Sequence, residues 1–105
     1  MTGALPPPAR TLPADVRPYH RTPDFTETSV PSGLLKSHST KEGTWGLIRI
    51  QSGELLLRFT DERRQHAELR LRAGDATGVI EPTIAHEVEP IGAVRFHVEF
   101  FRRPG

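Results

Sequence analysis

Hydrophobic and polar residues alternate with a period of two along much of the chain after position 34, which is typical of β-strands. The predicted strands cover residues 34–37, 45–51, 54–60, 66–71, 76–80, 86–89 and 94–101. Turns rich in glycine and proline separate them, and Ser52-Gly53 is predicted to be the two-residue loop of a hairpin. No segment keeps a period of 3.6 for ten residues, so the pattern predicts an all-β barrel or jelly roll.

The last predicted strand, 94–101, has two faces that differ in character. One face is wholly apolar and consists of Val94, Phe96, Val98 and Phe100. The other face is mixed and consists of Arg95, His97, Glu99 and Phe101. The apolar face alone is a sufficient core face, whereas a barrel with a polar pocket would turn the mixed face inward. Periodicity does not decide between these two arrangements.

Proline sets the first third of the chain apart from the rest. Seven of the ten prolines lie within the first 31 residues, and each removes a backbone donor and fixes φ. We therefore expect residues 1–17 to form an extended, polyproline-like arm and residues 18–105 to form a single domain. The arm either moves freely or covers the edge of a sheet or a neighbouring subunit.

Composition excludes several classes of site and partner. The chain has no cysteine, so a metal must be held by histidine and carboxylate, and no thiolate nucleophile is present. The net charge of +1 gives no field that would attract nucleic acid or a membrane surface. No apolar run approaches the roughly 20 residues of a membrane span, and the first residues lack the pattern of a secretory signal. These features lead us to expect a cytoplasmic protein.

Three of the histidines lie in contexts that suggest a metal site. His38 follows a predicted strand, His86 begins another, and His97 shares a strand face with Glu99. Two imidazoles and a carboxylate at the mouth of a barrel would suit Fe(II) or Zn(II) and leave positions open for water or a ligand. The alternative is that these residues are surface histidines or hydrogen-bonded core histidines, which is the commoner situation.

The strings HSTKEGTWG and IEPTIAHEVEP resemble the TehB/YeaR-like domain family, which was first noticed as the N-terminal part of some tellurite-resistance proteins. The colinear blocks YHRTPDFTETSVPSGLL, HSTKEGTWGLIRIQSGELLLRF, AGDATGVIEPTIAHEVEP and VRFHVEFFR extend the resemblance over about four-fifths of the chain. The resemblance implies a cupin, which is a double-stranded β-helix or jelly roll of two packed antiparallel sheets with a pocket between them.

The resemblance also implies candidate ligands for a divalent metal, with Zn or Fe expected. Cupins in general hold a metal with three histidines and one glutamate from two short motifs. His38 keeps one histidine of the first motif, whereas Thr40 and Gly46 stand where two further ligands are expected. His86, four residues after Pro82, fits the second motif.

The ending of the chain resembles an FxVEF-like family ending, which places Glu99 at a pocket position. The predicted metal ligands are therefore His38, His86 and Glu99, and His97 is either a fourth ligand or a hydrogen-bonding partner of a ligand. We expect the pocket lining to include Thr40, Lys41, Trp45 and Arg95. Lys41 or Arg95 would supply positive charge for an anionic ligand.

These expectations combine into a functional prediction. The chain is predicted to be a small cupin that binds a small molecule or an oxyanion at a histidine–carboxylate metal centre, in a stress response or in resistance to tellurite and other oxyanions. One alternative is a metal-dependent enzyme of the oxygenase or isomerase type. Another is a metal-free interaction module that forms a homodimer through its arm.

Overall fold

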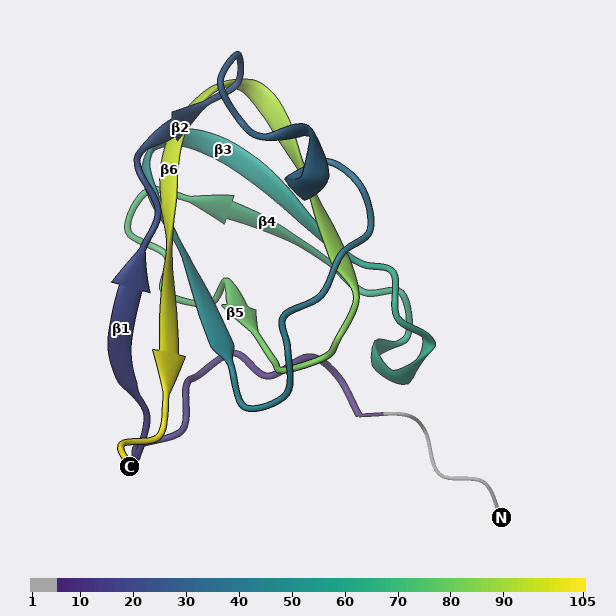
Figure 1. The fold of residues 1–105 in the computed structure, drawn as a ribbon. Helices are drawn as coiled ribbons and strands as arrows, with labels where there is room; N and C mark the ends of the chain where they lie inside the picture. The colour runs from purple at the N-terminus through teal and green to yellow at the C-terminus, as the bar shows by residue number, and fades with distance from the viewer. Residues whose placement is uncertain (1–5) are drawn as a thin grey trace.

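The computed structural model describes residues 6–105 and shows an antiparallel β-structure with two short 3-10 helices (Figure 1). The strands are β1 (Arg17–Arg21), β2 (Phe25–Thr26), β3 (Trp45–Phe59), β4 (Glu68–Arg72), β5 (Val79–Ile80) and β6 (His86–Arg102). The 3-10 helices are η1 (Ser32–Leu34) and η2 (Glu62–Arg64). Within the described residues, no helix has the length and apolar character needed to cross a membrane.

The strands form one hydrogen-bonded sheet in the order β1-β6-β3-β4, with β2 also paired to β6 and β5 also paired to β3. The all-β class expected from the alternation is confirmed. The finer expectation of two packed sheets in a cupin jelly roll stays a prediction, because the pairing joins all six strands into a single sheet.

The long strands β3 and β6 form the frame of the domain. They pair from Trp45 opposite Phe101 to Phe59 opposite His86, and Figure 1 shows both strands curving over together at the top of the view. The predicted hairpin at Ser52-Gly53 is wrong, because β3 continues through these residues and pairs with β6 on both sides of them. The predicted turn at 90–93 likewise lies within β6. The predicted strand at 34–37 is also absent, since η1 occupies 32–34 instead.

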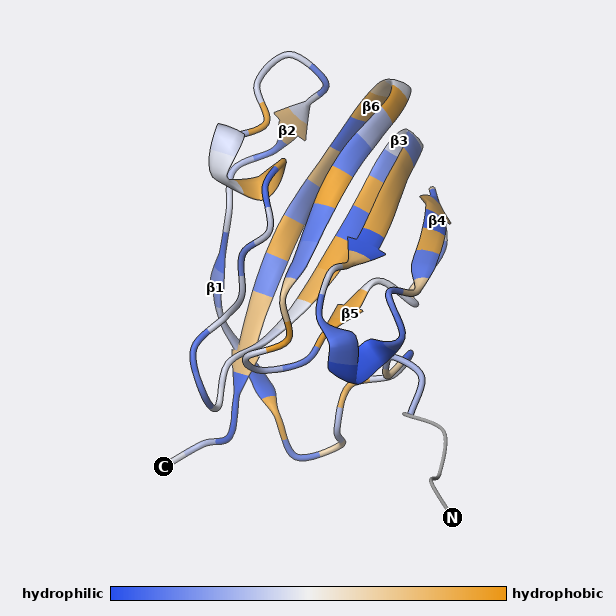
Figure 2. Cartoon of the chain, turned by 90° about the vertical axis from the view of Figure 1, so that its right-hand side faces the viewer, coloured by the Kyte–Doolittle hydropathy of each residue, from blue (hydrophilic) through white to orange (hydrophobic). Residues whose placement is uncertain are grey.

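Irregular pairing within β3 decides which residues face the core. The register shifts between Ile50 and Ser52, which leaves one extra residue in β3 and reverses the alternation of its faces. Before the shift the buried inward residues include Ile48 and Ile50, and after it they include Leu55 and Leu57. Figure 2 shows the resulting bands of hydrophobic and hydrophilic residues along β3 and β6.

The core answers the question that periodicity left open about the last strand. The main cluster of buried residues contains Val88, Val94, Phe96 and Val98 from β6, so the wholly apolar face of this strand points inward. Phe100 packs against the same cluster. The mixed face therefore forms part of the outer surface of the sheet.

The segment before β1 packs against that outer surface at one end of the sheet. A second apolar cluster joins the two and consists of Ala9, Leu12, Val16, Trp45, Leu47, Val79 and Phe101. The Ala9 N–H also donates a hydrogen bond of 3.0 Å to the Glu81 carboxylate, which Arg64 holds through two further hydrogen bonds. Residues 1–5 of the predicted arm lie outside the described residues.

Glycine is predicted to be essential at position 53, because β3 and β6 approach each other closely there. Its φ is +78°, and a Cβ added there would lie 2.0 Å from the backbone oxygen of Ala93. We expect Gly53→Ala to lower the free energy of unfolding by about 3 kcal/mol or more, because backbone atoms must move apart to admit the methyl group. Urea denaturation measures this change.

Gly92→Ala is the matched control for Gly53→Ala. Gly92 also has a positive φ, +69°, but a Cβ there would meet nothing within 4 Å. Its substitution should therefore cost only the strain of a left-handed conformation, about 1 kcal/mol. Equal losses for the two variants would contradict the proposed role of the close approach.

Candidate functional site

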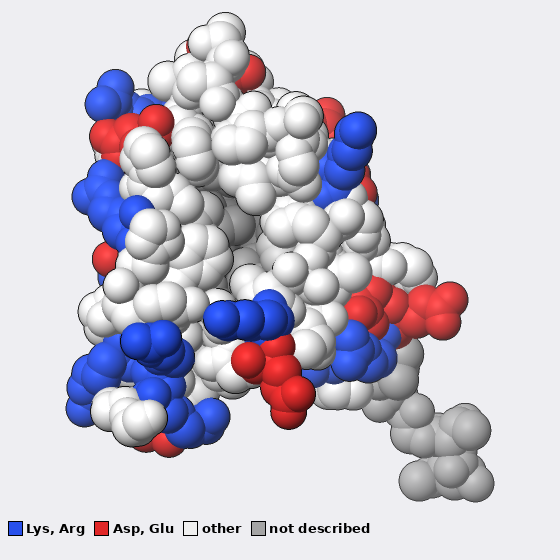
Figure 3. Space-filling model, viewed as in Figure 1, with Lys and Arg blue, Asp and Glu red and all other residues white. Residues whose placement is uncertain are grey.

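A cavity of about 620 Å³ lies on the inner side of the sheet, and Figure 3 shows it as the hollow in the middle of that face. Its apolar walls include Phe25, Leu34, Ile48, Ile80, Val88, Phe96, Val98 and Phe100. Its polar lining residues are Tyr19, His20, Thr22, His38, Ser39, Thr40, Lys41, Thr44 and His86. Among these lining residues, Lys41 is the only lysine, arginine, aspartate or glutamate. This central cavity is therefore mostly apolar, with three imidazoles and one cationic side chain.

His38 and His86 are neighbours because their backbones pair. The His38 N–H donates to the His86 carbonyl at 2.9 Å, and the His86 N–H donates to the His38 carbonyl at 2.8 Å. This isolated antiparallel bridge brings the two rings together, with their centroids 4.2 Å apart and their planes inclined by 58°. The expected proximity of these two histidines is thus observed.

Hydrogen bonds orient both rings in the same way. Nδ1 of His38 lies 2.8 Å from the carbonyl oxygen of Lys36, and Nδ1 of His86 lies 3.0 Å from that of Ile84. A carbonyl oxygen only accepts, so the geometry assigns a hydrogen to each Nδ1. In its neutral form, each ring would then carry its lone pair on Nε2, which is the atom that remains for a ligand.

His86 is held in its neutral form by its surroundings. His86 is only 4% exposed, and burial lowers the pKa of its imidazole to about 4. The hydrogen bond to Ile84 opposes this change in the pKa, while the nearby His38 reinforces it. At neutral pH, His86 is therefore an uncharged hydrogen-bond acceptor at the cavity.

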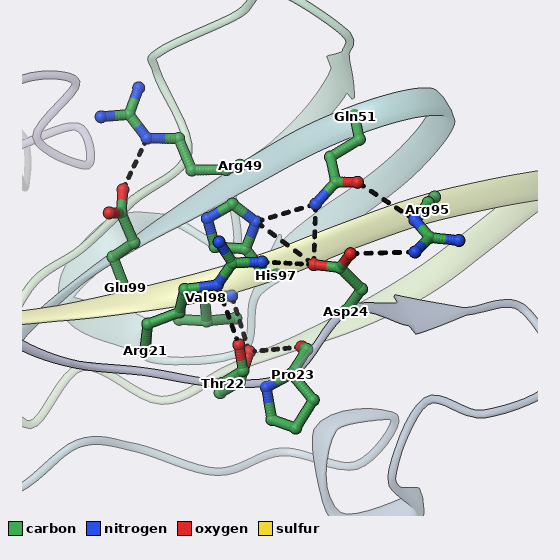
Figure 4. A network of polar contacts seen from close by, with 10 residues as sticks. All are labelled: Arg21, Thr22, Pro23, Asp24, Arg49, Gln51, Arg95, His97, Val98 and Glu99. Carbon is green, nitrogen blue, oxygen red and sulfur yellow. Dashed lines mark hydrogen bonds and ion pairs between the residues drawn. The ribbon is translucent and has the colours of Figure 1, made fainter.

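Glu99 and His97 do not join the histidine pair, so their predicted placement at the pocket is corrected. They lie on the outer side of β6, because Phe96 and Val98 occupy the inner side (Figure 4). Glu99 accepts a hydrogen bond of 2.7 Å from Arg49 across the sheet. Within residues 6–105, no three His, Asp or Glu side chains gather closely enough to hold a metal ion. The four predicted ligands therefore do not share one site.

The four predicted pocket residues also divide between the two sides of the sheet. Thr40 and Lys41 line the central cavity. Trp45 instead packs into the second apolar cluster beneath the N-terminal segment. Arg95 lies on the outer side, where it forms a 3.0 Å ion pair with Asp24 (Figure 4). Lys41 is thus the predicted cation that reaches the cavity.

Two lining residues from β1 were not expected from the sequence. His20 is an exposed residue that also lines the cavity, and it stacks on Phe100 with ring centroids 5.9 Å apart. The Tyr19 hydroxyl lies 3.4 Å from the Thr44 hydroxyl. A register shift between Pro18 and His20 marks a bulge here, and bulges commonly redirect side chains beside functional sites.

A polar network on the outer side holds one wall of the cavity in place. Asp24 accepts hydrogen bonds from Gln51, Arg95 and Arg21, as Figure 4 shows. These bonds lower the pKa of the Asp24 carboxyl, with the largest effect from Gln51. Thr22 and Phe25, which are close to Asp24 in the chain, line the cavity. The hydrogen bonds of Asp24 therefore attach this segment of the cavity wall to the outer side of the sheet.

Comparisons with known proteins identify similar domains. A family model described as the TehB-like domain matches residues 20–98. The crystal structure of TehB from Haemophilus influenzae superposes with a TM-score of 0.78 at 24% identity, covering 86% of this chain and 32% of that chain. A protein from E. coli strain K12 superposes with a TM-score of 0.79 at 20% identity, covering 90% of this chain and 98% of that chain. No curated protein matches the sequence significantly. The two structures support the likeness of fold.

The lowered pKa of His86 predicts how acid affects stability. Because the folded-state pKa of about 4 lies below the unfolded value of 6.5, the unfolded state binds protons first as the pH falls. The free energy of unfolding should therefore decrease by about 3 kcal/mol between pH 6.5 and 4 from this residue.

Denaturation of the wild type and of His86→Gln across this pH range measures the contribution of His86 as the difference between their free energies of unfolding. The effects of acidic groups that both proteins share cancel in this difference. The stability advantage of the wild type should shrink toward pH 4. His66→Gln, which alters an exposed histidine, is the control and should follow the wild type. A constant difference between wild type and His86→Gln would refute the assignment.

Proposed function

Because the chain belongs to the TehB-like domain family, whose members include domains of tellurite-resistance proteins, we propose that it is a cupin-type binding domain for a small organic molecule. The observation that carries this proposal is the pairing of His38 and His86 at a largely apolar cavity. The ligand would place its apolar part against the phenylalanine and aliphatic walls and its polar group near the imidazoles.

The size and lining of the cavity support a ligand of this kind. A volume of about 620 Å³ falls within the range of roughly 300–1,000 Å³ that is typical of small-molecule sites. The Nε2 lone pairs of the two imidazoles can accept hydrogen bonds from a hydroxyl group. Lys41 adds a positive charge at the lining, which would favour a carboxylate. A hydroxylated organic acid combines these properties.

The donor set bears on the alternative of a resident metal centre. The described residues that line the cavity include no carboxylate, and a three-ligand site does not form within residues 6–105. The residues present therefore do not fit the histidine–carboxylate centre predicted from the sequence. Binding through hydrogen bonds and apolar contacts does not require such a centre.

We expect 4-hydroxybenzoate, used as a probe of this chemistry, to bind in the cavity. NMR titration of the full chain should shift the amide signals of residues 38–41 and 86. His38→Gln should weaken binding by about tenfold through loss of an imidazole acceptor, equivalent to about 1.4 kcal/mol. Lys41→Gln should weaken binding of the acid but not of the neutral analogue 4-hydroxybenzamide.

The same experiment has a matched control and a direct alternative. His66→Gln changes an exposed histidine that does not line the cavity and should leave binding unchanged. Equal affinity of wild type and His38→Gln for the probe would contradict the proposal. Stoichiometric Zn(II) or Fe(II) binding that raises the melting temperature and disappears in His38→Gln would favour a metal-dependent site instead.

A further inference from the structure

Most arginines in this structure form ion pairs with aspartate or glutamate side chains. Nine of the twelve arginines form an ion pair with an aspartate or glutamate. Within residues 6–105, the three without such a pair are Arg10, Arg17 and Arg102. Arg17 and Arg102 are directly opposite each other where β1 pairs with β6. The structure therefore concentrates uncompensated positive charge at one end of this strand pair.

A second cavity, of about 450 Å³, lies at the same end of the sheet. It is lined by Arg17, Pro18, Tyr19, Arg102, Arg103, Pro104 and Gly105. Figure 3 shows lysine and arginine atoms gathered at the lower left, close to the C-terminus marked in Figure 1. We call this second cavity the arginine cleft and define it by Arg17, Tyr19, Arg102 and Arg103.

Contacts orient two guanidinium groups and leave many of their donors available. Arg102 stacks on the Tyr19 ring, with its guanidinium carbon 4.2 Å from the ring centroid, and forms no side-chain hydrogen bond within the described part of the chain. Arg17 uses Nη1 to donate to the Ala14 and Val16 carbonyls, each at 3.0 Å. Its Nε and Nη2 make no hydrogen bond to residues 6–105.

One carboxylate side chain competes for the charge of the cleft. Asp15 forms an ion pair with Nε of Arg103, and both side chains are more than half exposed. This contact lowers the pKa of the Asp15 carboxyl, so the group is ionised at neutral pH. The cleft thus combines three guanidinium groups with the Asp15 carboxylate beside Arg103 and the terminal carboxylate of Gly105, which still leaves an excess of positive charge.

We propose that the arginine cleft binds an oxyanion of the phosphate class, either free or as the terminal group of a small molecule. Guanidinium groups suit this ligand because their planar N–H donors match the spacing of phosphate oxygens and can bind in a bidentate manner. This site goes beyond the proposed function of the central cavity, which is mostly apolar and has Lys41 as its cationic lining residue. Tyr19 lines both cavities and places the two sites side by side.

Calorimetric titration with inorganic phosphate, at an ionic strength held constant with chloride, tests the proposal. The full chain should bind phosphate saturably, and Arg102→Gln should weaken the affinity at least tenfold. Asp15→Asn should strengthen it about threefold or more, because a competing carboxylate is removed from Arg103. Arg70→Gln is the control and should bind like the wild type, since Arg70 lies on β4 and pairs with Glu54.

A parallel titration with phenyl phosphate distinguishes the two forms of the ligand. Tighter binding than inorganic phosphate would support a terminal group on a small molecule, and equal binding would support a free oxyanion. Absence of saturable phosphate binding, or unchanged affinity in both Arg102→Gln and Arg17→Gln, would overturn the proposal. Loss of phosphate binding in Lys41→Gln with full binding in Arg102→Gln would also overturn it, by locating the anion in the central cavity.

Discussion

The pairing of β3 with β6 is the constraint on which the other elements of the domain depend. β1 and β2 attach to β6, while β4 and β5 attach to β3, so each short strand takes its place from this pair. At Gly53 of β3, the two backbones come so close that a side chain at this position would clash with the backbone of Ala93 in β6. At one end of the pair, His86 begins β6 and meets His38 beside the central cavity. At the other end, Arg102 lies opposite Arg17 and forms the arginine cleft.

Local patterning predicted the class of fold but not the continuity of its long strands. Alternation correctly indicated β-structure, because burial of one face of a strand imposes a period of two. Ser52-Gly53 has the composition of a hairpin turn, and a bulge also uses glycine with a positive φ. The apolar pattern does change phase between Ile50 and Leu55, as a one-residue bulge requires. Choosing between the two needs the contact with Ala93, which lies far along the chain and has no local signature.

Local patterns in the sequence also predicted the candidate site only in part. The motif resemblance assigned His38 and His86 to one site, and the bridge between their backbones brings the two rings together. Glu99 was misplaced by the resemblance of the chain ending to the family ending. Periodicity could not correct this placement, because it defines two faces of a strand without saying which one is buried. Phe101, the apolar member of the mixed face, is buried against the N-terminal segment on the outer side of the sheet. The role of Tyr19 depends on a bulge that its surrounding residues do not indicate.

The order of the paired strands along the chain has a consequence for how the protein folds. β3 finds its main partner only in β6, which is the last strand, and the turn-like segments between them form few regular elements. For such distant pairing, the entropy cost of closing long loops comes before the stabilising contacts between the strands form. Folding should therefore be slow for a domain of this size. During synthesis on the ribosome, the apolar residues of β3 remain without their partner until β6 has emerged. The nascent chain is therefore most prone to aggregation during that interval.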